Sequence, residues 1–550
     1  MTSIAEESKP APKRNFGGYA MFVAAGILLS RLAGLVRLRV FAHYLGATPA
    51  ADAFNVAMRV PNFLQNLFGE GVLSASFIPV YARLVSKGDE KLAGRVAGVF
   101  VSFIALGVSI IVLIGVLVTP VILAITAPGL EPPVMGLAIK LTRIIFPGVG
   151  LLVLYAWSLG ILNTHRQFFL SYVAPVLWNA SMIATLIIFG SRLRTAELAV
   201  ALAWGTFIGC ALQFGIQVPF VLRYEKNLSF GLDRTLEPVR EMFRSLGPVF
   251  AGRGVVQISG YVDTFIASFL PSGAFTNIVF AQTIYMLPIS LFGMSVAAAE
   301  LPQMAGQTGT DEEIHTAIRK RIQRGLRQVA FFVVPTTVAF ILLGRILVAA
   351  LFQTGKFGAH TTLIVWYILI GSTIGLLVAT MGRLYSSAFY ALRDTRTPFR
   401  FAVARVIVGA SLGFLLAFPF RHAFGAILVA LGLPVPAGDI GLLGAVGITA
   451  ASGIAAWVEY LFLRRALQRR IGTLESMTGF YVGLWASAIA AGVLALVCDR
   501  MFLHDVAQRL FLPHVMEAIA ASGIFGIIYF TGAILLGVPE ARATLSRLKR

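Results

Sequence analysis

Permanent positive charges lie inside the first long apolar stretch of this 550-residue sequence. Arg31, Gly34 and Arg37 recur three residues apart, which at about 100° per residue places them on one helix face about 120° wide. The glycine between the two guanidinium groups leaves an open notch for a bulky anion. Guanidinium groups stay charged at physiological pH and bind phosphate oxygens through paired hydrogen bonds. The stripe therefore predicts a site for a pyrophosphate.

Polar residues also interrupt the second apolar stretch. Asp52, Arg59 and Asn66 recur every seven residues and drift by only about 20° per step, and Asn62 and Glu70 flank that line. An arginine at membrane depth costs on the order of 3 kcal/mol, so it normally faces protein or a water-filled cavity. Two adjacent helices of this kind predict a polar cavity within the bilayer. The alternative is that these side chains reach the interfaces or neutralise one another, a role that suits Arg59 and Glu70 best.

The elements that carry these residues belong to a polytopic helical membrane protein. The sequence is 57% hydrophobic and 13% charged, with a mean hydropathy of +0.83, whereas soluble domains have about 25% charged residues. Apolar runs of about 20 residues recur along the whole chain, and this is the length of a membrane-spanning helix. We predict about fourteen spans, centred near residues 30, 67, 108, 149, 180, 208, 256, 290, 338, 374, 408, 453, 487 and 526.

The distribution of basic residues predicts the orientation of the spans. The net charge is +20, and the basic residues cluster in the short loops after even-numbered spans, for example Arg83 and Lys87 after the second. Loops after odd-numbered spans are nearly free of them, with Arg192 and Arg194 as exceptions. The positive-inside rule then places both termini in the cytoplasm, which requires an even number of spans. Orientation explains the charge better than nucleic-acid binding does, so no nucleic-acid partner is predicted.

The order of the spans predicts two lobes and an additional pair of helices. Spans one to six and seven to twelve would form two six-helix lobes with a pseudo-two-fold repeat, as in transporters built from repeats. The predicted divisions are residues 1–16 for a cytoplasmic tail, 17–223 for the N-lobe, 236–465 for the C-lobe, 474–538 for spans thirteen and fourteen, and 539–550 for a basic cytoplasmic tail.

Five places in the chain predict irregular elements. The second span is expected to break at Pro61 and at the turn 69–71, and the eighth is expected to kink at Pro288. Residues 311–327 are polar around most of their circumference, which predicts an amphipathic cytoplasmic helix leading into span nine. Residues 424–433 are apolar but too short to cross, which predicts an interfacial or re-entrant piece.

Motifs for catalysis and metal binding are missing from the sequence. It contains no Walker motif, no HExxH and no GxSxG, and Cys210 and Cys498 match no metal or redox spacing. We therefore predict no enzymatic activity, no cofactor and no metal site. Glu300, late in span eight, is a candidate for a proton-titrating site, and the alternative is a carboxylate that is satisfied at a helix end.

Several longer motifs follow one another along most of the chain. They are SRLAGLVRLRVFAHYLGATPAADAFNVAMRVPNFLQNLFGEGVLSASFIPVYA from Ser30, TAPGL from Thr126, IIFPGVGLLV from Ile144, GILNTHRQF from Gly160, QISGYVDTFIASFL from Gln257, LFQTGKF from Leu351 and FYALRDTRTP from Phe389. Together, in this order, they resemble the MurJ (MviN) family of bacterial lipid II flippases, which belongs to the MOP exporter superfamily.

The resemblance implies a fold, a cargo and a location. Proteins of this family have two six-helix lobes around a central cationic cavity, and two C-terminal helices that form a groove for a polyprenyl tail. They move undecaprenyl-pyrophosphate-linked GlcNAc-MurNAc-pentapeptide, which is lipid II, from the cytoplasmic to the periplasmic leaflet by alternating access. The implied location is the bacterial inner membrane. The implied partners are lipid II and the lipid bilayer, with the cell-wall synthesis machinery as a further candidate.

The resemblance also implies roles for individual residues. The positions that match functionally important residues of the family are Ser30, Arg31, Arg37, Asp52 and Asn62. Arg31 and Arg37 would bind the pyrophosphate or the carboxylates of the sugar-peptide, and Asn62 is assigned with them to substrate binding. Asp52 would belong to a polar gate or ion pair, to which Ser30 and Glu70 are also assigned.

Two usual cavity cations of the family are replaced in this chain. The family usually has arginine where Gln65 and Thr283 stand here. Arg253, at membrane depth in span seven, or Arg143 is a candidate to supply the missing charge. Arg253 is therefore included among the predicted substrate-binding residues.

Other function classes stay open at this point. The same fold suits an exporter of another polyprenyl-linked glycan or of an amphiphilic drug, although a drug exporter should carry acidic residues for cationic cargo. A membrane glycosyltransferase should show a catalytic carboxylate on a long loop, and no loop here is long. A scaffold protein would not need buried arginines.

Overall fold

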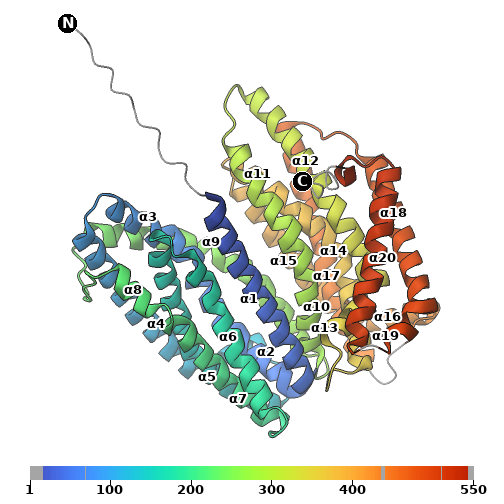
Figure 1. The fold of residues 1–550 in the computed structure, drawn as a ribbon, viewed down its shortest axis with the longest axis horizontal. Coiled ribbons are helices and arrows are strands. Elements are labelled where there is room, and N and C mark those ends of the chain that lie inside the picture. Colours follow the sequence, from blue (N-terminus) through green and yellow to red (C-terminus); the bar gives the residue numbers. More distant parts are fainter. Residues whose placement is uncertain (1–15, 69, 435–439, 510, 543–550) are drawn as a thin grey trace.

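The computed structural model describes residues 16–68, 70–434, 440–509 and 511–542, without the side chains of residues 16–25, 67–75 and 246–259. Regular structure in this part of the chain is helical (Figure 1), and an isolated bridge joins Thr354 to Phe357 within a turn. Eleven helices of the described part are long and apolar enough to cross a membrane. The all-α, multi-pass class predicted from composition is therefore confirmed.

The first part of the chain supplies the helices on the left of Figure 1. They are α1 (Phe16–Tyr44), α2 (Pro49–Phe68), α3 (Glu70–Ser86), α4 (Glu90–Thr126), α5 (Pro132–Thr164), α6 (Phe168–Phe189), α7 (Thr195–Gly215), α8 (Val218–Tyr224) and α9 (Glu237–Ser268). Within this group α1 packs on α6, while α5 packs on α2, α4 and α7. Residues 45–48 form the turn between α1 and α2.

The remaining helices form the group on the right. They are α10 (Ala274–Pro288), the π-helical turn η1 (Ile289–Met294), α11 (Ser295–Ala305), α12 (Asp311–Leu342), α13 (Gly344–Phe352), α14 (Ala359–Ala391), α15 (Arg396–Ala417), α16 (Arg421–Ala430), the 3-10 turn η2 (Ile440–Leu443), α17 (Gly444–Ile471), α18 (Thr478–Cys498), the π-helical turn η3 (Asp499–Leu503), α19 (His504–Ala507) and α20 (Pro513–Leu535). Here α14 packs on α10, α12 and α17, and α18 packs on α20 and α12.

The two groups meet at one end of the molecule. At the lower end of Figure 1, α1 contacts α13 and α2 contacts α10. The start of α1 lies at the upper end, which is the side predicted to be cytoplasmic. Two groups of helices agree with the two lobes predicted from the order of the spans, although α9, which was predicted to begin the second lobe, also packs on α3 and α4 of the first group. The residue boundaries assigned to the lobes stay a prediction, as does the count of fourteen crossings, although every predicted span centre falls within a helix.

Helix α9 contacts both groups. Its first half packs against α3 and α4, where Arg83 pairs with Glu241 and the rings of Phe100 and Phe243 lie 5.7 Å apart. Its other contacts include α15 of the second group. The chain therefore passes from one group to the other along a single helix.

Most of the irregular elements lie where the sequence predicts them, and one prediction is wrong. α2 continues through Pro61 and ends at Phe68, so Pro61 does not break the second span as expected. A proline removes one backbone hydrogen bond, and a helix held by its neighbours tolerates this loss. After Pro288 the helix changes to a π-helical turn, which is the irregularity predicted there. The predicted amphipathic segment is the first half of α12, and α16 is the short apolar helix expected near residues 424–433.

Candidate functional site

A cavity of about 340 Å³ lies where α1 and α2 face α6, α10 and η1. The structure brings Arg31, Gly34 and Arg37 together on its wall, as their spacing on one helix face predicts. Thr283 of α10, one of the two positions where the family usually has arginine, lies on the opposite wall. The site therefore lies between the two groups of helices, and two guanidinium groups contribute to its surface.

Arg31 presents an exposed guanidinium group to this cavity. Its Nη1 donates to Ser290 Oγ at 3.3 Å, across the gap between α1 and η1. The Ser290 hydroxyl in turn donates to the carbonyl of Met286 at 2.7 Å, inside its own helix. This contact uses one N–H of Arg31, so other donors remain for a ligand.

Arg37 is surrounded by weak partners. Its Nη1 lies 3.4 Å from the sulfur of Met182, and its guanidinium carbon lies 4.9 Å from the ring centre of Trp178. Its Nε is buried and has no hydrogen-bond partner. A thioether and an indole face do not repay the cost of removing a cation from water. An anion in the cavity would supply the missing acceptor.

Helix α6 contributes a polar group that the sequence analysis did not identify. Asn179 is buried, its Nδ2 donates to the carbonyl of Pro175 at 3.0 Å, and its Oδ1 has no partner. A Cβ built on Gly34 would lie 4.0 Å from that oxygen, so Asn179 stands behind the notch between the arginines. The sequence feature that could have identified Asn179 is an amide side chain in the middle of an apolar run, because such groups at membrane depth usually have a role.

Asp52 of α2 caps the first turn of α10. Its carboxylate accepts from the backbone N–H groups of Gly273 and Thr276, the latter at 2.8 Å, and from the Thr276 hydroxyl at 2.6 Å. Gly273 has φ +93°, and a Cβ there would lie 2.6 Å from the carbonyl oxygen of Ala47. The partners of Asp52 are therefore backbone and hydroxyl donors at a helix N-terminus, a favourable place for a negative charge.

A second contact joins the same ends of the two groups. At the end of α1, the His43 carbonyl accepts from Lys356 N at 2.9 Å, and His43 Nδ1 lies 2.7 Å from Thr354 Oγ1. Arg39 donates to the carbonyls of Ala350 and Leu351 in α13. We call this contact between α1 and residues 350–356 the latch. Together with the Asp52 cap, it holds the two groups against each other at the end predicted to be periplasmic.

The other predicted site residues lie away from the cavity or outside the described side chains. Ser30 and Asn62 are half-buried on α1 and α2, and neither is part of the described lining. The side chains of Arg253 and Glu70 lie outside the described residues. Their roles stay predictions.

Three further charged residues have partners elsewhere. Arg143 is exposed and donates from Nε to the carbonyl of Val116 in α4 at 3.2 Å, so it does not supply charge to the described lining. Arg59 lies over the ring of Phe275 at 5.4 Å, and its structural role stays a prediction. Glu300 pairs with Arg321 at 3.1 Å, which is the satisfied carboxylate given as the alternative to a proton site.

The comparisons with known proteins agree across nearly the whole chain. A sequence model of the family described as "Lipid II flippase MurJ" matches residues 41–519. A relative from Haemophilus influenzae, named probable lipid II flippase MurJ, is 30% identical over 531 residues, covering 93% of this chain and 98% of the relative. A protein from Burkholderia cenocepacia, named lipid II flippase MurJ, is 28% identical, covering 95% of this chain and 98% of its own.

Solved structures share the fold at lower identity. A lipid II flippase MurJ in an inward closed conformation superposes with a TM-score of 0.71 at 22% identity, covering 94% of this chain and 100% of that one. An inward-facing multidrug MATE transporter of the MOP superfamily gives 0.60 at 17% identity, covering 82% and 99%. The fold is therefore common to flippases and drug exporters, and it does not separate them. The family model, which matches most of the sequence, does separate them, and it shows that this chain belongs to the MurJ family.

Proposed function

We propose that this protein is a lipid II flippase. It moves the undecaprenyl-pyrophosphate-linked peptidoglycan precursor from the cytoplasmic to the periplasmic leaflet of the bacterial inner membrane. The observation that carries the proposal is the buried Nε of Arg37, which has no partner and lies beside a cavity that Arg31 also lines. Two permanent cations in a bilayer-spanning bundle match a doubly charged pyrophosphate better than a cationic drug.

The proposed mechanism is alternating access between the two lobes. The latch and the Asp52 cap close the periplasmic end, so cargo enters from the cytoplasmic side, where both chain termini lie in the proposed orientation. The cavity of about 340 Å³ is at the lower end of the range of small-molecule pockets, and suits the pyrophosphate region of the cargo. The sugars and peptide require a more open state. Asn62 and Arg253 are proposed as further substrate contacts, and Ser30 and Glu70 as parts of the gate.

The test is rescue of a bacterium depleted of its own lipid II flippase. We expect the native chain to restore growth and Arg31→Ala and Arg37→Ala to fail at equal membrane levels. Each charge-assisted hydrogen bond is worth about 1.5–3 kcal/mol, so losing one weakens binding on the order of tenfold to a hundredfold. Arg192→Ala is the matched control, because Arg192 is an exposed arginine in a loop.

Two outcomes would contradict the proposal at different points. Growth supported by both alanine variants would show that transport does not need a contact between these arginines and the pyrophosphate. If the native chain is folded and inserted in the membrane but does not restore growth, lipid II is not its cargo. A related polyprenyl-linked glycan or an amphiphilic drug would then be tested in the same cells.

A further inference from the structure

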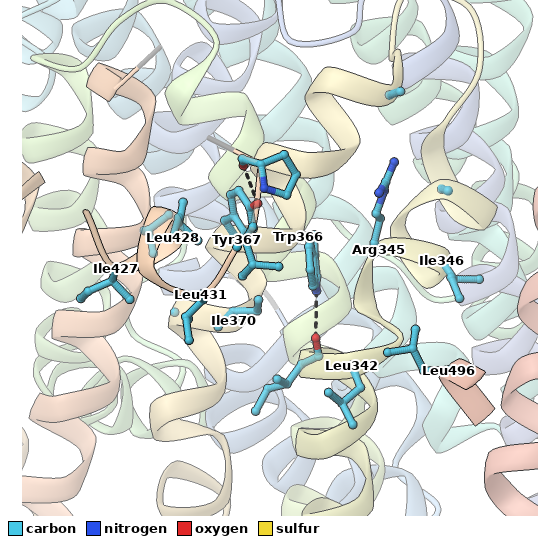
Figure 2. A pocket seen from close by; sticks show the side chains of 18 of the residues that line it. Leu342, Arg345, Ile346, Trp366, Tyr367, Ile370, Ile427, Leu428, Leu431 and Leu496 are labelled. Carbon is cyan, nitrogen blue, oxygen red and sulfur yellow. Dashed lines mark hydrogen bonds between the residues drawn. The ribbon is translucent and has the colours of Figure 1, made fainter. Parts of the chain in front are cut away.

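A second and larger pocket lies within the C-terminal half of the molecule. It has a volume of about 990 Å³, and none of the described residues lines both this pocket and the Arg31 cavity. Its walls come from α12, α13, α14, α16, α17 and the ends of α18 and α20, so it lies between the second lobe and the C-terminal helix pair. Figure 2 shows side chains of α12, α13, α14, α16 and α18 around it. We call it the α16 pocket.

The α16 pocket has an apolar interior. Leu342, Ile370, Leu428, Leu431 and Leu496 line it (Figure 2). The polar atoms of two aromatic residues on its wall are already occupied. Trp366 Nε1 donates to the carbonyls of Phe340 and Ile341, both at 3.2 Å, and the Tyr367 hydroxyl donates to the carbonyl of Pro434 at 2.7 Å. The wall therefore suits a hydrocarbon chain, and the volume is at the upper end of about 300–1,000 Å³ for ligand pockets.

Charges of both signs lie at the edge of this pocket. Arg345 of α13 and Arg500 of η3 are exposed guanidinium groups. Asp499 of η3 and Glu517 of α20 are each only 6% exposed. A ligand that extends from the apolar interior to this edge therefore meets both cations and carboxylates.

One carboxylate oxygen in this group has no partner. Glu517 is contacted by His504 Nδ1 at 3.0 Å and by His514 Nδ1 at 3.8 Å, and the Asp499 carboxyl group lies near it. Asp499 Oδ1, by contrast, is buried with no hydrogen-bond partner. A buried acceptor without a donor costs about 1–3 kcal/mol, more when it is charged, so a ligand that donates to it gains that amount.

We propose that the α16 pocket binds a zwitterionic phospholipid with a primary amine head group, of the phosphatidylethanolamine class. Its acyl chain lies against the leucines and isoleucines, its phosphate lies at Arg345 and Arg500, and its ammonium donates to Asp499 Oδ1. An anionic lipid such as phosphatidylglycerol, or a polyprenyl phosphate, has no ammonium for that oxygen. A choline head group carries the positive charge without an N–H donor. The pocket lies at the end predicted to be periplasmic, so the lipid comes from the outer leaflet.

The proposal is independent of the cargo. It uses residues of η3, α13 and α20, and it leaves the Arg31 cavity untouched. A lipid that fills the space between the second lobe and the α18–α20 pair would hold these elements together. It would act as a structural lipid, bound throughout transport.

The experiment measures lipid binding to the purified, delipidated full-length protein by native mass spectrometry. Phosphatidylethanolamine, phosphatidylcholine, phosphatidylglycerol and undecaprenyl phosphate are added separately at equal concentrations. We expect phosphatidylethanolamine to bind about tenfold more tightly than the other three. Arg31→Ala should bind it as the native protein does, because Arg31 lies in the other cavity.

Variants locate the binding site. Asp499→Asn should lower the affinity for phosphatidylethanolamine about tenfold and leave that for phosphatidylglycerol unchanged. Asp505→Asn, at an exposed carboxylate of α19, is the matched control and should change neither. Leu428→Trp, which fills the pocket, should weaken binding of every lipid.

Two results would overturn the proposal. One is a preference of the native protein for phosphatidylglycerol or undecaprenyl phosphate, a comparison that needs no variant. The other is a folded Asp499→Asn protein, judged by its thermal unfolding, that keeps the native preference for the ethanolamine head group.

Discussion

At the scale of single residues, the two arginines of the cavity differ in how far their charge is satisfied. Arg31 is exposed and bonds to a serine hydroxyl, whereas Arg37 lies against sulfur and an aromatic ring with its Nε unpaired. A cation over an indole face gains roughly 0.5–2 kcal/mol, which is less than the cost of burying it. Arg37 is therefore the residue whose environment a bound anion improves most.

Asp52 leads to a prediction about the cap of α10. Asp52→Asn leaves one carbonyl oxygen, removes the charge that favours a helix N-terminus and turns an amide group toward other donors. We expect a loss of about 1–2 kcal/mol in the docking of α2 on α10. The backbone amides of Gly273 and Thr276 donate hydrogen bonds to Asp52. Their hydrogen exchange should therefore become about tenfold faster.

A cap of another helix is the control for this measurement. Asp89 is exposed and accepts from Leu92 N at 3.1 Å at the start of α4, away from the contact between the lobes. Asp89→Asn should leave exchange in α10 unchanged. Unchanged exchange in Asp52→Asn as well would show that the cap does not hold α10 in place.

At the scale of elements, the short turn between α14 and α15 joins three helices. Asp394 accepts from the backbone N–H groups of Arg396 and Thr397, at 3.1 and 3.0 Å, and thereby caps α15. Its second oxygen accepts from Arg470 of α17 at 2.8 Å. The oxygens of Asp394 are therefore used in holding α14, α15 and α17 together.

This turn leads to a prediction of pH dependence. The backbone N–H of Thr397, followed by its hydroxyl and Arg470, lowers the pKa of Asp394 below its ordinary value of 3.8. A lowered pKa means that the charged form stabilises the fold above that ordinary value and that this stability is lost as the pH falls further. Asp394→Asn should therefore lower stability by about 1 kcal/mol at neutral pH, and the deficit should shrink as the pH falls through the lowered pKa.

Thermal unfolding of the purified protein between about pH 3 and pH 7 measures this effect. Asp311→Asn, at an exposed position in the first turn of α12, serves as the control for removal of a surface carboxylate. A deficit of Asp394→Asn that has the same size at both ends of the pH range would contradict a role for the charge.

At the scale of the whole molecule, the contacts between the two lobes are concentrated at one end. The latch and the Asp52 cap bring α1 to α13 and α2 to α10, while α9 connects the lobes along its length. In the proposed cycle, opening the end predicted to be periplasmic requires the latch to separate. Holding the latch closed is therefore the most direct test of the transport cycle.

A reversible cross-link across the latch should stop transport. Cys210 and Cys498 are first replaced by alanine, and His43→Cys and Thr354→Cys are then combined, because these side chains are 2.7 Å apart at their nearest polar atoms. Under oxidation we expect rescue of flippase-depleted cells to fall to background, and a reductant should restore it. The two single-cysteine variants are the controls. Undiminished rescue by a fully cross-linked protein would argue against opening at this end.

The sequence alone determined the class of the protein and the helix face that carries the arginines. Apolar length and helical periodicity are local properties, so the span centres, the short α16 helix and the stripe of Arg31, Gly34 and Arg37 follow from the order of residues. The continuation of α2 through Pro61 did not follow, because neighbouring helices decide whether a proline ends a helix.

Only the tertiary structure decided what stands opposite these residues. Asn179, Met182 and Ser290 reach the arginine stripe from α6 and η1, and Asp52 meets the N-terminus of α10. The α16 pocket likewise joins segments that are far apart in the chain. Such contacts depend on how whole helices pack against one another, and the local spacing of residues does not predict that packing.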